Sequence, residues 1–161
     1  MIKDDLKPKV YIETSIVSYL TAWRSPDLVM AANQEMTKEW WERRGNFDLY
    51  ISALVIQEAS AGDPTAAKKR LEQLEGIPEL DITEDVESFA NQLLKNIPLP
   101  QKAKIDALHI AVATINGIDY LLTWNCAHIA NAILRPKIEA LCRESGYEPP
   151  IICTPQELKE I

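Results

Sequence analysis

Four polar side chains in this sequence could together bind a divalent cation and hydrolyse a phosphodiester. Each follows a predicted strand or lies in a predicted helix beside one; they are Glu13, Glu58, Asp106 and Asn125. Because clustered carboxylates repel one another, a site that holds them together normally needs a cation. Oxygen ligands without a histidine pair or a thiolate cluster favour Mg²⁺ or Mn²⁺ over zinc. Such an ion can activate a water and stabilise the leaving oxygen of a phosphodiester. We therefore predict that the protein hydrolyses phosphodiesters.

The same acids have a purely structural explanation, which stays open from the sequence alone. Carboxylates near helix ends also serve as caps and interact with the helix dipole. Glu13, for example, is followed at once by Thr14 and Ser15, two residues that often begin helices. A solvated glutamate in a turn would have this sequence too.

The four side chains meet only if a parallel sheet brings them together. Short apolar runs bounded by turn residues predict strands at 10–12, 47–51, 79–82, 119–123 and 150–153. Apolar periodicity and capping residues predict helices at 14–20, 25–44, 52–60, 65–75, 84–95, 103–116 and about 128–144, with a terminal helix opened by the capping box at Thr154. Strands that alternate with helical crossovers indicate an α/β fold, a three-layer α/β/α sandwich around a central parallel sheet of four or five strands.

In such a sheet all carboxyl ends of the strands share one edge, where ligands bind in open α/β folds. Glu13 and Asn125 follow strands, and Glu58 and Asp106 lie in helices beside that edge. Asp119 opens its strand instead, and five residues at about 3.3 Å each place it about 16 Å from the edge. We therefore exclude Asp119 from the site.

Composition indicates a single domain, 1–161, in a reducing cytoplasm. The chain has 161 residues and a net charge of −7, which argues against a protein that coats nucleic acid. Its three cysteines, Cys126, Cys142 and Cys153, form no CxxC pair, and Cys126 with His128 is a weak zinc pattern. The N-terminal segment lacks the apolar core of a signal peptide, and no run is long enough to span a membrane.

Four blocks in order resemble a PIN domain of the VapC type of toxin ribonuclease. They are VYIETSI at 10–16, LVIQEA at 54–59, KIDALHIA at 104–111 and DYLLTWN at 119–125. The likeness extends from about residue 9 to 152. It implies a PIN-like fold, Mg²⁺- or Mn²⁺-dependent cleavage of RNA, and a cognate antitoxin that blocks the acidic pocket.

The resemblance also implies a role for each matching residue. Glu13 stands where the family typically has its first Asp, and Glu58 and Asp106 match the next two acids; all three are expected to be catalytic and to bind the metal. Ser15 and Thr123 match small hydroxyl residues that line the pocket.

Two positions depart from the family pattern. A glutamate at position 13 moves the carboxylate outward by about 1.5 Å, and Mg²⁺ tolerates poor geometry badly. Asn125 stands where a fourth acid is often found, so it keeps an oxygen ligand but removes a charge. We therefore expect one tightly held metal rather than two.

Neighbouring residues offer further roles. His109, one turn after Asp106, is expected to line the pocket, as a structural residue or as a proton carrier. His128 is expected in the first turn of a helix, without a catalytic role. Trp124 could stack on a base or simply pack. The cationic run at 68–70 is a solvated face or an RNA contact.

Two other functions compete with the nuclease. A phosphoacceptor signalling domain would need adjacent early acids and a late lysine at a strand end, which are absent from the sequence. A catalytically weakened PIN-like module that binds RNA or a protein partner fits the departures at Glu13 and Asn125. We also expect a homodimer, for which exposed aromatic side chains on the early helices (Tyr19, Trp23, Trp40 and Trp41) would provide the surface.

Overall fold

The computed structural model describes residues 6–159 and contains a five-stranded parallel sheet. In chain order the strands are β1 (Lys9–Ile12), β2 (Asp48–Ser52), β3 (Glu79–Leu80), β4 (Tyr120–Leu122) and β5 (Ile151–Cys153). They lie side by side in the order β3-β2-β1-β4-β5, and every neighbouring pair is parallel. The predicted parallel sheet is confirmed.

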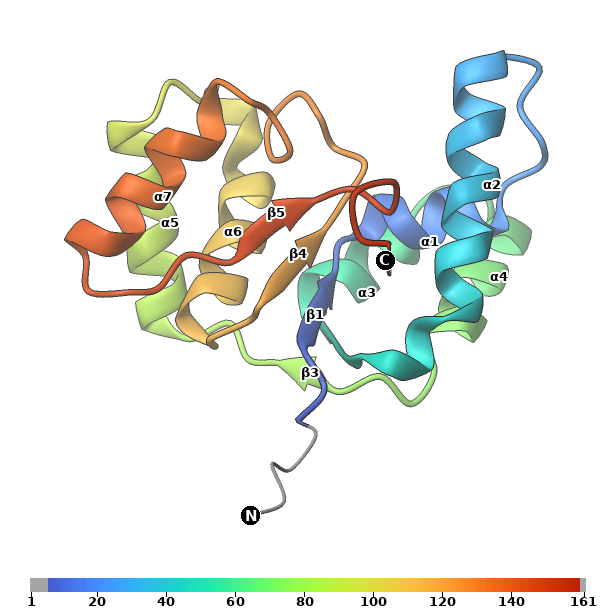
Figure 1. Ribbon diagram of the computed structural model, residues 1–161, viewed down its shortest axis with the longest axis horizontal. Coiled ribbons are helices and arrows are strands. Elements are labelled where there is room, and N and C mark those ends of the chain that lie inside the picture. Colours follow the sequence, from blue (N-terminus) through green and yellow to red (C-terminus); the bar gives the residue numbers. More distant parts are fainter. Residues whose placement is uncertain (1–5, 160–161) are drawn as a thin grey trace.

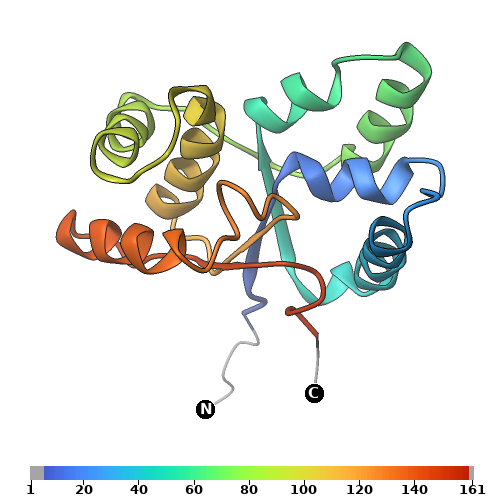
Figure 2. The same cartoon turned by 90° about the horizontal axis from the view of Figure 1, so that it is seen from above.

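Helices flank this sheet on both sides, which confirms the α/β architecture. They are α1 (Thr14–Thr21), α2 (Leu28–Glu42), α3 (Ala53–Ala59), α4 (Pro64–Leu74), α5 (Glu84–Asn96), α6 (Lys104–Ile115) and α7 (Leu134–Glu144), with 3₁₀ turns at Arg44–Asn46 and Gln101–Ala103. Two views agree that α5, α6 and α7 gather on one side of β1, and α1, α2 and α4 on the other (Figures 1 and 2).

The centre of the sheet is β1, which is apolar on both faces. Val10, Tyr11 and Ile12 are fully buried, and β1 pairs with both β2 and β4. The chain proceeds outward from β1 to β3 and then returns to place β4 on the other side of β1. This reversal creates a topological switch point between β1 and β4, and ligands of open α/β sheets bind at the carboxyl ends of such strands.

Side-chain caps set the starts of the helices that lead to and from the sheet. Asp27 accepts a hydrogen bond from the Met30 amide at the start of α2, and Asp63 does the same for Ala66 in α4. Thr83 caps α5. Thr83 is the predicted cap, whereas the cap of α2 is Asp27 and not the predicted Ser25, so α2 begins three residues later than predicted.

The prediction of a helix at about 128–144 is wrong over its first turns, because α7 begins only at Leu134. Asn125 accepts a hydrogen bond from the amide of His128 (3.0 Å), and Asn131 accepts one from the amide of Ile133 (2.9 Å). Such side-chain turns compete with the helical bonding of the backbone. His128 therefore lies in a loop and not in the first turn of a helix.

The C-terminal segment also differs from its prediction. The capping-box bond forms, with the Thr154 amide donating to Glu157 at 3.1 Å, but the residues that follow make a turn rather than a helix. A continuation of that helix past 159 and the start of the N-terminal segment (1–5) lie outside the described residues. None of the helices within 6–159 is both long enough and apolar enough to cross a membrane.

The early aromatic residues divide between core and surface. Trp40 and Trp41 are buried, whereas Trp23 is 87% exposed. Leu28 and Val29, a few residues later at the start of α2, are exposed as well. Among the aromatic residues considered for a partner surface, Trp23 is the most exposed. It therefore remains, with Leu28 and Val29, the apolar surface that the early helices offer.

Candidate active site

Glu13 directly follows β1 and caps α1, and its carboxylate is almost completely buried. One oxygen, Oε2, accepts the backbone amide of Ser15 at 3.1 Å. The other, Oε1, accepts the hydroxyls of Ser15 and Thr123. Only 5% of Glu13 is exposed, so these donors replace the water that the carboxylate loses on burial. The longer side chain of glutamate is accommodated because it folds back onto its own helix start.

The two hydroxyls are held as donors to Glu13 by the backbone of the neighbouring strand end. Ser15 Oγ accepts the amide of Trp124 at 2.8 Å, and Thr123 Oγ1 accepts the amide of Asn125 at 2.9 Å. Each hydroxyl proton is therefore free to point at the carboxylate. The structure places both predicted pocket-lining hydroxyls against Glu13, across the switch point between β1 and β4.

Glu58 reaches the same edge from the last turns of α3. Its Oε1 accepts the hydroxyl of Thr14 at 2.7 Å and lies 2.6 Å from Nε2 of His109. Burial raises the pKa of Glu58, but the hydrogen bonds from His109 and Thr14 and the electrostatic attraction of His109 outweigh it and hold the pKa below its usual range. Glu58 is therefore ionised at neutral pH.

His109 is fully buried on α6, and both of its ring nitrogens have partners. Nε2 contacts Glu58, while Nδ1 lies 2.7 Å from the hydroxyl of Tyr11. The same Tyr11 hydroxyl lies 2.7 Å from Oγ of Ser52, the residue before α3. These bonds form a buried chain from Ser52 through Tyr11 and His109 to Glu58.

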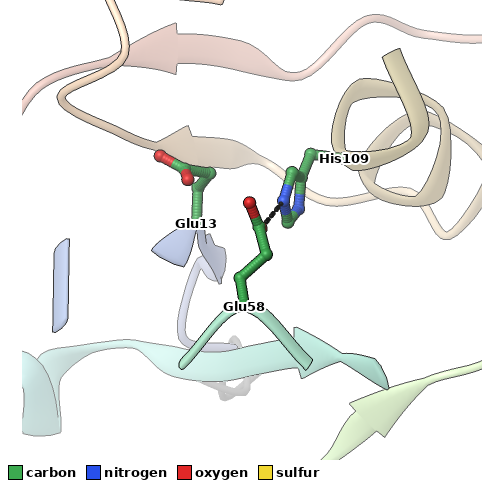
Figure 3. A group of neighbouring side chains, drawn as sticks. All are labelled: Glu13, Glu58 and His109. Carbon is green, nitrogen blue, oxygen red and sulfur yellow. Dashed lines mark hydrogen bonds and ion pairs between the residues drawn. The ribbon is translucent and has the colours of Figure 1, made fainter. Parts of the chain in front are cut away.

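Glu13, Glu58 and His109 form the one group of potential metal ligands found within residues 6–159, with ligand atoms all within 4.8 Å of one another. Figure 3 shows the Glu58 carboxylate directed at the His109 ring, with Glu13 at the end of its strand beside it. Two carboxylates suit Mg²⁺ or Mn²⁺, and an imidazole is compatible with a transition metal. Thr14 and His109 both form their hydrogen bonds with Oε1 of Glu58. Neither of them binds the other carboxylate oxygen, Oε2. The donor set therefore fits a divalent cation.

Asp106 and Asn125 are not members of this group. Oδ2 of Asp106, in the first turn of α6, lies 2.9 Å from Nδ1 of His128. Asn125 turns its side-chain oxygen to the His128 amide. His128 thus joins the two predicted site residues to each other, and metal binding by either of them stays a prediction.

Trp124 packs against the protein. Its ring stacks on Tyr19 with 5.7 Å between centroids, and its indole N–H donates to Thr37 at 2.7 Å. The cationic run at 68–70 is also engaged locally, since Lys69 lies over the Trp23 ring and Arg70 donates to the carbonyls of Ala59 and Ala61.

Sequence reasoning did not assign a site role to Thr14, Tyr11, Ser52 or His128. Thr14 and Ser52 open the predicted helices 14–20 and 52–60, and Tyr11 lies in the predicted strand 10–12. The one available signal was Tyr11, because a tyrosine inside a strand buried on both faces needs a partner for its hydroxyl. The identity of that partner depends on contacts across 98 residues of sequence.

A family model of the PIN domain matches residues 10–125. Among solved structures, VapC20 of Mycobacterium tuberculosis, described as a sarcin-ricin loop cleaving toxin, has a TM-score of 0.57 and 19% identity, over 74% of this chain and 92% of VapC20. At this identity the likeness shows a shared fold. None of the curated proteins matches.

Proposed function

Since this chain belongs to the PIN domain family, we propose that it is a Mg²⁺- or Mn²⁺-dependent endoribonuclease of the VapC type, the toxin of a toxin–antitoxin pair. The observation that supports this most is the approach of Glu13 and Glu58, 45 residues apart in sequence, to one buried imidazole at the switch point of the sheet. The fold shared with a toxin described as cleaving the sarcin-ricin loop supports RNA as the substrate class.

In this proposal Glu13 and Glu58 hold the cation. When bound, such an ion activates a water and neutralises the charge that develops on a phosphodiester. Ser15 and Thr123 keep the Glu13 carboxylate in one orientation, because each donates to it while accepting a backbone amide. His109 and Thr14 keep Glu58 ionised. They bind its Oε1, which leaves Oε2 for the cation.

Asp106 is proposed as the third acid, presented from the first turn of α6. Its carboxylate has a second oxygen besides the one that contacts His128, so a cation and the imidazole can share it. Asn125 contributes no charge at the position of a fourth acid. Because the site then has three acids and not four, it favours one bound ion over two.

A toxin of the VapC type implies two protein partners, a cognate antitoxin and a second copy of the chain. An antitoxin would cover the acidic pocket, and a homodimer would use an apolar surface such as the one that exposes Trp23, Leu28 and Val29. Cys126, Cys142 and Cys153 are all free, as expected for a protein that works in the reducing cytoplasm. Sedimentation at high concentration tests the dimer, and a monomer under all conditions would contradict it.

The test of the function is RNA cleavage by protein purified without an antitoxin. We expect cleavage of a mixture of ribosomal and transfer RNA with Mn²⁺ or Mg²⁺, and none with EDTA. Asp106→Asn and Glu58→Gln should lose cleavage, whereas Glu72→Gln, which removes an exposed acid of α4, should retain it. If wild type and Asp106→Asn are equally inactive over a range of metals, the protein is a binding module and the ribonuclease proposal is wrong.

A further inference from the structure

We propose that Tyr11 is a positioning residue of this site: it fixes His109, and through His109 it holds the Glu58 carboxylate in the orientation that a divalent cation needs. The inference rests on the proposed function for its consequence, but its geometry is independent of any ion. Tyr11 lies in the central strand, away from the substrate, and acts only through the imidazole.

The directions of the hydrogen bonds in this chain follow from Glu58. A metal-binding carboxylate at Glu58 can only accept a hydrogen bond, so Nε2 of His109, 2.6 Å away, carries a proton and donates it. If the imidazole is neutral, Nδ1 accepts from the Tyr11 hydroxyl, which in turn accepts from Ser52. If it is charged, both of these bonds reverse. In either state the Tyr11 oxygen supplies the matching partner and Nε2–H stays aimed at Glu58.

Glu58 needs such support because its own helix does not fix it. The side chain is flexible, is 39% exposed and projects from α3, a helix of seven residues. Its two contacts with Thr14 and His109 hold Oε1, which determines where Oε2 points. Hydrogen-bond partners behind a metal ligand commonly change metal affinity or activity by about 10- to 100-fold.

The chain of bonds also joins elements that lie far apart in the sequence. Ser52 immediately precedes α3 and Glu58 lies near its end, while Tyr11 belongs to β1 and His109 to α6. A phenylalanine would fill the space of the Tyr11 ring, so packing does not require the hydroxyl. The hydroxyl is fully buried and its partners, at 2.7 Å each, lie on the path to Glu58. This specific placement indicates a role in the site.

Tyr11→Phe tests the proposal, with Tyr50→Phe as its matched control from the paired position of β2. We expect Tyr11→Phe to weaken binding of Mn²⁺, measured by the electron paramagnetic resonance of the free ion, by about tenfold. Raising the Mn²⁺ concentration should recover most of the RNA cleavage. Tyr50→Phe should match wild type in both. Equal Mn²⁺ affinity in folded wild type and Tyr11→Phe would overturn the proposal.

Two further measurements separate the alternatives. Spin-echo modulation spectra of bound Mn²⁺ should show no directly bonded ¹⁴N, because His109 supports Glu58; a bonded nitrogen would make His109 a ligand and overturn the positioning role. In metal-free protein, nuclear magnetic resonance should show a His109 Nε2 proton protected from exchange in wild type and exposed in Tyr11→Phe. If this proton is equally protected in both, Tyr11 does not hold the imidazole.

These outcomes are distinct from failure of the proposed function. A wild type that neither binds Mn²⁺ nor cleaves RNA ends the ribonuclease proposal, while the exchange of the imidazole proton still decides whether Tyr11 positions His109. If Tyr11→Phe does not fold, Ser52→Ala removes the far end of the same chain of bonds and should shift Mn²⁺ affinity in the same direction. An unchanged affinity in folded Ser52→Ala, with Tyr11→Phe unfolded, would count against the chain.

Discussion

Glu13 shows how the longer side chain of glutamate is accommodated where the resemblance to the family implies aspartate. Its carboxylate folds back to cap α1 and accepts the hydroxyls of Ser15 and Thr123. The extra methylene thus places the carboxylate within hydrogen-bonding distance of these donors. The length of residue 13 and the positions of those donors therefore form one geometric unit.

This predicts that Glu13→Asp impairs the enzyme although it restores the residue typical of the family. The shorter side chain withdraws the carboxylate by about 1.5 Å from Thr123 and Ser15. A misplacement of about 1 Å at a reacting site can cost about 100-fold, so we expect a comparable drop in kcat/KM for RNA cleavage. Activity equal to or above wild type would show that Glu13 is a handicap and not a fitted ligand.

Because Tyr11 is buried, we predict that the free energy of unfolding falls at alkaline pH. Burial raises the pKa of Tyr11 well above its ordinary value of 10.0, and the charges of Glu13 and Glu58 raise it further, against the lowering effect of Ser52. Because the folded pKa exceeds the unfolded one, the stabilisation is complete below pH 10 and falls as the pH rises above it. The free energy of unfolding should drop by about 1.4 kcal/mol per pH unit from this residue.

Denaturant unfolding between pH 9 and 11 measures this slope. Tyr11→Phe should reduce the slope, by up to about one proton at the alkaline end of this range. An identical slope in wild type and Tyr11→Phe would show that the Tyr11 hydroxyl ionises as easily in the folded protein as in the unfolded one.

The sequence allowed prediction of Glu13, Glu58 and the hydroxyls beside Glu13, but not of the hydrogen bonds that support Glu58. Glu13 and Glu58 follow strands whose edges must coincide, so their approach could be inferred from element order alone. The partner of Tyr11 could not, because His109 lies 98 residues away and its ring orientation depends on how α6 packs. Likewise, the contact between Asp106 and His128 required a loop conformation that no periodic pattern describes.

At the scale of elements, the loop between β4 and α7 is set by two asparagines. Periodicity identified the strands and most helices because each has one apolar face directed at the sheet. It failed from about 128 to 133, where Asn125 and Asn131 satisfy backbone amides with their side chains and delay the helix to Leu134. Local side-chain bonding overrides helical patterning there.

Asn125 variants test whether this side chain works mainly as a turn. Asn125→Ala should lower the free energy of unfolding by about 1 kcal/mol, since the His128 amide loses its acceptor. Asn125→Asp keeps an oxygen in the same place and should stay within about 0.5 kcal/mol of wild type. Urea denaturation gives both values, and equal stability of all three proteins would mean that the turn does not depend on Asn125.

At the scale of the whole molecule, the doubly wound topology is what makes a site from distant residues. Glu13 and Thr123 are 110 positions apart, yet they are bonded because β4 returns to the side of β1. The same order of strands buries the core on both faces of the sheet. The match to the PIN domain model from 10 to 125 covers the segments that build this arrangement.

The burial of two thiols gives a test of the global packing. Burial raises the pKa of Cys153 to about 12 and also raises that of Cys142, while Cys126 is exposed. The thiolate is the reactive form, so a disulfide reagent at pH 8 should modify Cys126 rapidly and the other two only after unfolding. Rapid modification of all three in the native protein would contradict the packing of β5 and α7.

Glu13 and Glu58 are proposed to form one cation site beside His109. Anomalous diffraction from a crystal soaked in Mn²⁺ tests it most directly. We predict a peak within bonding distance of both carboxylates, and its loss in Glu58→Gln under the same soak. A saturated crystal with no peak there, or with the ion held by carboxylates elsewhere, would contradict the account.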